Sequence, residues 1–397
     1  HPIVHGHLGS NKGLHVLFYG HYDVQPIDPL ELWANDPFEP AIEQLPSGPV
    51  IRARGSSDDK GQLMTFVEAC RAWIKQNKAL PFKVTFFFEG EEESGSPNLV
   101  PFMKKHKKEI SSDIVLICDT GLFESRVPSI VTRLRGLLKE EIIITGPDKD
   151  LHSGMYGGIS VNPARILTNI LSELHDEDGA VTIPDFYDGV PELPQNILDQ
   201  WLGLNFKHDQ FLADVGLSTP AGEKDRSALE MLWSRPTCEI NGIKAGYIGE
   251  GFKTVLPAQA SAKISFRLVA NQDPLKIRKK FRNMVKDLLP DDCQVFFKEH
   301  EASKASQMDI SPPEFEKARE AISEEWGIEA AFIGCGGSIP IAGYFQKITG
   351  VDPMLIGFAK DDDQIHSPNE KYDLESFRKG IRSWVRVINS FSELQNV

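Results

Sequence analysis

The sequence lacks two features that mark large classes of protein, namely long hydrophobic runs and a net positive charge. Its longest apolar stretches, such as Val84–Phe88 and Ile114–Cys118, have the length of strands rather than of membrane-spanning helices. The formal net charge is −14 at pH 7, whereas phosphate binding needs a basic surface. We therefore expect no membrane-spanning helix and no nucleic-acid partner.

Cysteine is also scarce, and its few residues follow no motif. The 397 residues include five cysteines, and no two of them have the Cys-x-x-Cys spacing of redox and zinc-ribbon sites. This pattern is typical of reduced thiols, so we expect a cytoplasmic protein rather than a disulfide-linked secreted one. The chain opens with His1-Pro2, with neither a methionine nor a signal-like segment, so we expect a missing or processed N-terminal part.

The patterns that are present indicate two domains. A chain of 397 residues exceeds the length that one ordinary hydrophobic core supports. In the first third, strand-length apolar runs and helical stretches are typical of a central sheet covered by helices. The middle of the chain has half-exposed strand patterns, and the last part returns to the first style. We expect an α/β domain formed by 1–135 and 310–397, interrupted by an inserted α+β domain at 136–309.

Acidic residues and histidines follow four of the apolar runs, at the points where the strands are expected to end. In chain order they are His21 and Asp23, Glu89–Glu93, Asp119, and His366. Because the carboxyl ends of parallel strands meet at one edge of a sheet, we expect these side chains to gather there. A fifth motif, Arg54–Gly61, lies just before a helical stretch, where its loop can approach the same edge.

The residue types at this edge favour a catalytic metal centre. Histidine nitrogens and carboxylate oxygens, without cysteine, suit Zn²⁺, with Mn²⁺ or Co²⁺ also possible. An excess of carboxylates over histidines favours two divalent ions, because one carboxylate can bridge them. Each motif alone also fits a structural role: a solvated acidic loop, a hydrogen-bonded histidine, or a helix cap at Asp58. Their coincidence at one edge favours the metal centre.

These motifs resemble those of the M20 metallopeptidases, and within that family those of the carnosinase-like cytosolic dipeptidases. The resemblance covers essentially the whole chain, and the segments that carry it are His21–Pro26, Arg54–Gly61, Glu89–Gly95, Asp150–Gly158 and Ile365–Glu370. It implies a zinc-peptidase-like central sheet flanked by helices, with the inserted domain acting as a lid and dimerisation domain. It also implies that a helical segment usual before the first strand is absent from this sequence.

The resemblance implies two overlapping sets of metal ligands. The ligands would be His21, Asp58 and Asp119 for one ion, and Asp58, Glu93 and His366 for the other. Asp58 would therefore bridge the two ions. The resemblance also implies a cis peptide bond between Asp58 and Asp59.

Two further residues at the edge receive catalytic roles from the same resemblance. Glu92 would be the general base that takes a proton from the attacking water and returns it to the leaving amine. The family pattern, a glutamate pair directly before Ser-Gly, selects Glu92 and Glu93 from the acidic run. Asp23 would orient the imidazole of His21, since the two side chains point to one side of an extended strand end.

The inserted domain also contains motifs of this family. His152 matches a histidine that reaches the active site of the neighbouring subunit and stabilises the oxyanion, so we expect a homodimer formed through the lid domain. Arg267 matches a residue that grips the substrate carboxylate, for which a guanidinium is well shaped. Thr254 matches another substrate contact, and Gly337 and Ser338 match a loop that contacts the same carboxylate.

We therefore expect a dinuclear hydrolase that cleaves the amide bond of dipeptides or similar small carboxylate-bearing substrates, using a water held between the metals. Cys335 stands where the carnosinase-like branch has a glutamate, which favours an alternative: a deacylase of N-acyl or N-succinyl amino acids. A non-catalytic binding protein is a remote alternative, because Glu92 and the ligands are present. A serine or cysteine hydrolase is disfavoured, since neither a Gly-x-Ser-x-Gly elbow nor a suitable cysteine motif occurs.

Overall fold

The computed structural model describes residues 1–10, 13–337 and 339–394, and the chain divides into two compact units. The first unit comprises His1–Thr132, Met308–Ile333 and Pro340–Val397, and the second comprises Arg133–Gln307 and Gly334–Ile339. The short segment Gly334–Ile339, which we expected in the first domain, groups with the second unit. There the Arg135 side chain donates from Nε to the carbonyl of Gly336 at 3.1 Å.

The first unit is built on a mixed sheet. In the order of pairing, its strands are β1 (Val4–Leu8), β5 (Lys83–Glu89), β2 (His15–His21), β6 (Ile114–Ile117), β16 (Pro353–Leu355) and β7 (Ser129–Leu134). Two more strands pair with β7, namely β15 (Ala331–Cys335) and, at the last two residues of β7, β14 (Ser306–Gln307). The neighbours β5, β2, β6 and β16 are parallel, whereas β1 and β7 are antiparallel to their neighbours β5 and β16. The carboxyl ends of the central parallel strands therefore share one edge.

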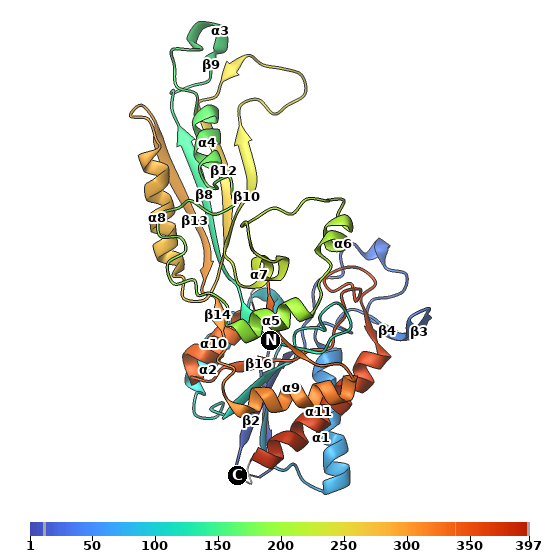
Figure 1. Ribbon diagram of the computed structural model, residues 1–397. Helices are drawn as coiled ribbons and strands as arrows, with labels where there is room; N and C mark the ends of the chain where they lie inside the picture. The colour runs from blue at the N-terminus through green and yellow to red at the C-terminus, as the bar shows by residue number, and fades with distance from the viewer. Residues whose placement is uncertain (11–12, 338, 395–397) are drawn as a thin grey trace. The chain divides into compact units, whose positions relative to one another are not determined.

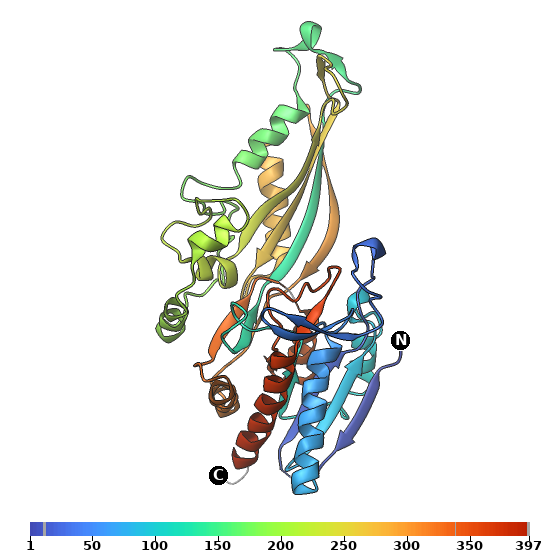
Figure 2. The same ribbon diagram turned by 90° about the vertical axis from the view of Figure 1, so that its right-hand side faces the viewer.

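Helices cover both faces of this sheet. On one face α1 (Lys60–Asn77) and α11 (Leu374–Leu394) lie side by side (Figure 1, Figure 2), and the ring of Phe18 stacks on Phe66 of α1 with 3.9 Å between centroids. Tyr19, the next residue of β2, points to the opposite face, where its ring meets Phe345 of α10 (Pro340–Thr349). The predicted α/β fold, a central sheet flanked by helices, is confirmed.

α11 shows how the sequence pattern places a helix on the sheet. Its buried large apolar residues recur at helical spacing and are Trp384, Val387, Ile388 and Phe391. On its other side, Arg382 donates to Glu325 of α9 (Pro313–Trp326) at 2.6 Å. The helix therefore buries one stripe and keeps a charged one outside.

A small antiparallel sheet in the first unit brings two distant loops together. Its strands are β17 (Lys371–Asp373), β4 (Gly48–Arg52) and β3 (Ala41–Leu45), in that order. Lys371 pairs with Arg52, and the N–H of Ala53 donates to the carbonyl of Glu370 at 3.1 Å. The remaining elements of this unit are η1 (Leu30–Leu32), η2 (Glu92–Ser94) and α2 (Leu99–Lys105).

The second unit contains an antiparallel sheet with helices on one face. Its strands, in order, are β10 (Thr237–Ala245), β12 (Gln259–Leu268), β8 (Gly136–Thr145) and β13 (Gln294–Ser303). α4 (Pro163–Ser172) and α8 (Pro274–Asp287) pack against it (Figure 1), and every second residue of β12 from Ala260 to Leu268 joins the core between them. The other elements are β9 (Leu151–His152), α3 (Ser153–Tyr156), α5 (Gln195–Gly203), α6 (His208–Ala213), α7 (Ala228–Trp233), β11 (Val255–Leu256) and β14 (Ser306–Gln307).

Among the helices of the described residues, none has both the length and the apolar character required to cross a bilayer. All five cysteines lie within the described part of the chain, and no disulfide joins any two of them.

Candidate metal centre

Strand ends and loops of the first unit place the expected ligands at one edge of its sheet. His21 is the last residue of β2 and pairs in register with Glu89, the last residue of β5, so η2 with Glu93 begins close by. Asp119 follows the end of β6 by two residues. Asp58 lies in the loop between β4 and α1, and His366 lies between β16 and β17.

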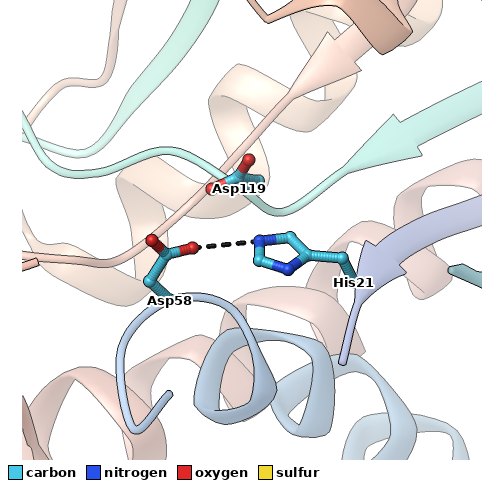
Figure 3. Close-up of side chains that lie close together, drawn as sticks. All are labelled: His21, Asp58 and Asp119. Atoms are coloured by element: carbon cyan, nitrogen blue, oxygen red, sulfur yellow. Dashed lines mark hydrogen bonds and ion pairs between the residues drawn. The ribbon is translucent and has the colours of Figure 1, made fainter. Parts of the chain in front are cut away.

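The structure brings these side chains together as two groups that share Asp58. His21, Asp58 and Asp119 offer ligand atoms that all lie within 4.8 Å of one another (Figure 3), and Asp58, Glu93 and His366 do the same. Oδ1 of Asp58 lies 3.0 Å from Nε2 of His21, and its Oδ2 lies 2.9 Å from Nε2 of His366. The two oxygens of one carboxylate therefore face two different histidines.

Asp58, rather than its neighbour Asp59, takes this shared position. The peptide bond between them is cis, as expected. The side chain of Asp59 is fully buried, and its carboxylate accepts from the N–H of His21 at 3.1 Å and from the thiol of Cys118 at 3.1 Å. Asp59 thus supports the backbone beneath the site and belongs to neither group.

Asp23 contacts His21 from the side of the ring that faces away from Asp58. Its Oδ1 lies 3.4 Å from Nδ1 of His21. Its carboxylate also accepts from the backbone N–H groups of Glu92 at 3.2 Å and Glu93 at 3.0 Å. One carboxylate therefore ties the first histidine to the segment that carries both glutamates.

Burial and mutual repulsion raise the pKa values of three carboxyl groups at this edge, those of Glu92, Glu93 and Asp119. Burial, and then the negative charge of Asp119, raises the pKa of Glu92 to about 7. Burial and then Asp58 raise the pKa of Asp119 to about 6, and the same two causes raise that of Glu93. Carboxylates crowded in this way favour a nearby positive charge, since a cation would offset both burial and repulsion.

One orphaned atom tests whether a metal ion fits. Oε1 of Glu93 is buried and has no hydrogen-bond partner among the described residues, although buried polar atoms nearly always have one. Oε2 of the same carboxylate accepts from Nε2 of Gln25 at 2.6 Å. The histidine nitrogens, the carboxylate oxygens and the orphaned oxygen together fit two divalent cations of the zinc type.

A third acidic group of the first unit is already neutralised. Asp362, Asp363 and Asp373 converge, but Nζ of Lys371 lies 2.9, 2.8 and 2.8 Å from their carboxylates. The ammonium group occupies the position that a cation would take, so this group needs no metal ion.

Two of the residues expected in the lid lie together in the second unit. β9 pairs with β11, and the N–H of Ser153 donates to the carbonyl of Thr254 at 2.9 Å, so His152 and Thr254 are close neighbours. Nδ1 of His152 accepts from the N–H of Gly154 at 3.0 Å. A neutral imidazole that accepts at Nδ1 carries its proton on Nε2, so His152 presents a donor there.

Arg267 belongs to a second cluster of the same unit, which includes one residue that the sequence motifs do not reveal. Burial, and then the charge of Arg267, lowers the pKa of Arg135 to about 10. The backbone N–H of Arg135 donates to the carbonyl of Gly337 at 3.2 Å, so Arg135 contacts the expected carboxylate loop and also lies near enough to Arg267 for their charges to repel. Ser338 lies outside the described residues.

Sequence reasoning also assigned no role to Gln25 or Glu370. Both fall inside motifs that carry the family resemblance, at His21–Pro26 and Ile365–Glu370. Their position within these motifs was the one sign in the sequence that they belong to the site. Arg135 had a weaker signal, since it stands only where the pattern changes from one domain to the next. Their contacts depend on residues far away in the chain.

A helix-flanked α/β sheet with two groups of histidines and carboxylates at its edge defines a metal-dependent hydrolase. The chain belongs to peptidase family M20/M25/M40, whose family model matches residues 17–390. It is 32% identical to the Cys-Gly metallodipeptidase DUG1 of Candida albicans, over 96% of this chain and 80% of the relative. It is 28% identical to the Beta-Ala-His dipeptidase of Homo sapiens, over 99% of this chain and 78% of the relative.

A solved structure supports the same assignment. The M20 family metallo-carboxypeptidase Sso-CP2 from Sulfolobus solfataricus matches with a TM-score of 0.81 and 29% identity, over 99% of this chain and 88% of the other. The likeness therefore extends over both units of the chain.

Proposed function

We propose that this protein is a dipeptidase that uses two divalent metal ions, most suitably Zn²⁺, to cleave the amide bond of small carboxylate-bearing substrates. The observation that carries the proposal is the position of Asp58, whose two oxygens face His21 and His366. Similarity to proteins named as a Cys-Gly metallodipeptidase and a Beta-Ala-His dipeptidase supports a dipeptide as the substrate.

Each metal group has a defined membership in this proposal. His21, Asp58 and Asp119 would hold one ion, and Asp58, Glu93 and His366 the other. When bound, the two ions would activate a water and polarise the scissile carbonyl. Asp23 would hold the ring of His21, so that Nε2 stays directed at the site.

Glu92 would carry out the proton transfer at this edge. It belongs to neither metal group, yet it immediately precedes the ligand Glu93 in η2. Its carboxylate would take a proton from the attacking water and return it to the leaving amine, which is general acid–base catalysis.

The second unit would supply substrate contacts and a subunit interface. Arg267 and the loop at Gly337 would bind the substrate carboxylate, and Thr254 would contact the substrate next to His152. We propose that His152 donates to the oxyanion in the partner's site of a homodimer. The exposed apolar residues that follow it, Met155 and Ile159, are 72% and 90% exposed and suit a protein contact. The cytoplasmic location stays a prediction, which the lack of disulfides among the described cysteines supports.

A deacylase of N-acyl amino acids is the second candidate, and one contact favours it. Sγ of Cys335 accepts from the N–H of Gly337 at 3.4 Å. A cysteine therefore stands beside this loop, at the position where the carnosinase-like branch has a glutamate that would recognise a free substrate amine.

Parallel assays of metal-replete protein test both candidates. We expect hydrolysis of Cys-Gly or β-Ala-His dipeptides, its loss on chelation, and its return when Zn²⁺ or Mn²⁺ is added. Hydrolysis of N-acetyl amino acids in preference to unblocked dipeptides would favour the deacylase instead. If the metal-replete protein hydrolyses neither class, the proposed function is wrong. Glu92→Gln serves as the inactive control in each assay.

A further inference from the structure

The carboxylate of Glu370 accepts four hydrogen bonds from the loop that carries Asp58. Oε2 accepts from Nη1 of Arg54 at 2.8 Å and from the N–H of Gly55 at 2.8 Å. Oε1 accepts from the N–H of Ser57 at 2.8 Å and from the N–H of Asp58 itself at 3.0 Å. An ionised carboxylate offers about four lone-pair positions, so all of them are used.

These contacts determine the path of the backbone up to the shared metal ligand. Three of the four donors are main-chain N–H groups. They lie in a loop, residues 53–59, that is not part of a strand and so has no strand pairing to fix its backbone. Gly55 adopts a φ of +77°, and a Cβ there would come within 2.4 Å of Val24. The loop is therefore tightly enclosed, and Glu370 supplies the acceptors that such a buried backbone needs.

Glu370 also belongs to the segment that carries the second histidine. It follows His366 by four residues, and its own carbonyl accepts from the N–H of Ala53 at 3.1 Å. A second brace lies nearby, because Asp363 accepts from the hydroxyl of Ser57 at 2.7 Å. The loop that carries His366 thus fixes the loop that carries Asp58 through both backbone and side-chain hydrogen bonds.

The charge and burial of Glu370 show that it acts on this loop rather than on a metal ion. Its side chain is 0% exposed and that of its ion-pair partner Arg54 is 2% exposed. Arg54 in turn lies over the ring of Trp33, 5.1 Å from the centroid. Glu370 belongs to neither metal group, since both of its oxygens are directed at the loop.

We propose that Glu370 is a positioning residue that holds the carboxylate of Asp58 between His21 and His366 and thereby sets the affinity for both metal ions. This role rests on the proposed two-metal function. A merely structural residue would affect metal binding only as far as its loss lowers stability. If Glu370 positions Asp58, its substitution lowers the metal affinity by more than that.

Glu370→Gln tests the proposal with little change in shape. The amide oxygen can accept from two of the four donors, but the amide nitrogen is itself a donor and would face the other two N–H groups. The loop must then shift away from its present path. We expect metal affinity to fall about 10–100-fold, as is typical when a group that orients a ligand is removed. We also expect kcat to fall with little change in KM, and the absorption spectrum of the Co²⁺-substituted protein to change.

Glu140→Gln is the matched control. Glu140 is also a 0% exposed carboxylate, and it accepts from Nε of Arg278 at 2.9 Å and Nε of Arg282 at 2.7 Å, but it lies in the second unit. We expect this variant to lose thermal stability and to keep the metal affinity and the Co²⁺ spectrum of the wild type.

Metal titration, thermal unfolding and the Co²⁺ spectrum are measured on the wild type and both variants. A folded Glu370→Gln variant with wild-type affinity and spectrum overturns the role of Glu370 and leaves the proposed function intact. Equal losses of affinity in both variants overturn it as well. If Glu370→Gln does not fold, Glu370→Asp replaces it, which keeps the charge but is one methylene too short for all four donors. Unchanged affinity in that variant also overturns the role. A wild type that binds fewer than two ions overturns the proposed function itself.

Discussion

The carboxylate of Asp23 lies 3.4 Å from Nδ1 of His21, so this imidazole is held at one nitrogen while the other faces the site. Although burial opposes ionisation, the contact with His21 lowers the pKa of Asp23, which keeps the carboxylate charged at neutral pH. The same carboxylate accepts from the backbone beneath Glu93. Its charge therefore supports two ligands at once.

We expect Asp23→Asn to weaken metal binding or lower turnover by about 10–100-fold. The amide keeps the size of the side chain but removes the negative charge, and it can present a donor to Nδ1 instead of an acceptor. Metal titration and steady-state kinetics on the purified variant measure both effects. Wild-type values for both would show that Asp23 does not orient His21.

Glu92→Gln should retain both metal ions and lose turnover by about 10²–10⁴-fold, because an amide cannot take up the proton. Metal analysis and kinetics are measured on the same sample. Glu91→Gln is the control in the same acidic run, since Glu91 accepts from Asn98 instead and belongs to neither metal group. Loss of a metal ion in Glu92→Gln would instead identify Glu92 as a ligand.

His152→Ala should leave metal content unchanged and lower turnover by about 10²–10³-fold, the usual effect of losing one oxyanion donor. The proton on Nε2, which the hydrogen bond at Nδ1 enforces in the neutral ring, would be the donor lost. Kinetics and metal analysis of the variant test this expectation. Turnover at the wild-type rate would remove His152 from the reaction.

Mixing His152→Ala with Glu92→Gln tests whether His152 acts in the partner's site. In a mixed dimer, one site would combine an intact Glu92 with an intact His152 from the other subunit. We expect activity to return once subunits exchange. Differently tagged subunits verify that exchange has occurred. If activity does not return after verified exchange, His152 does not act in the site of the partner subunit.

We expect the protein to lose stability in acid, because three histidines near the N-terminus are harder to protonate in the folded chain than in the unfolded one. Burial is the largest of the effects that lower the pKa values of His5, His7 and His15. The pKa of His15 falls to about 4. The rings of His7 and His15 both hydrogen-bond to the hydroxyl of Thr85, at 2.8 and 2.6 Å. The unfolded chain binds protons at these histidines near pH 6.5, whereas the folded His15 does so only near pH 4. The free energy of unfolding should therefore fall as the pH drops from 6.5 toward 4.

His15→Gln isolates this contribution. The amide can still hydrogen-bond to Thr85 but does not titrate. Urea unfolding at a series of pH values between 7.5 and 4.5 should show a smaller acid-induced loss for the variant than for the wild type. Equal losses would show that His15 ionises as easily in the folded protein as in the unfolded chain.

The sequence by itself determined the class of fold and the composition of the expected metal centre. Alternation between apolar strands and helical stretches is a local pattern, so the positions of β2, β5 and β6 follow from short windows. The polar residues after these strands, His21, Glu93 and Asp119, could be assigned to one edge because parallel strands end together. The motifs also selected Asp58 over Asp59 through a resemblance, not through any local preference of the backbone.

Only the tertiary structure decided how these residues are held. Glu370 contacts Arg54 and Asp58 across 316 and 312 positions of the chain, and Arg135 contacts Gly336 across 201. No periodicity links residues so far apart, since hydrogen bonds of this kind form only after the sheets have brought their loops together. The contact between Arg135 and Gly336 joins the segment Gly334–Ile339 to the second unit, with which it groups. Sequence patterns report the surroundings of a residue along the chain, whereas its partners in space depend on the folded backbone.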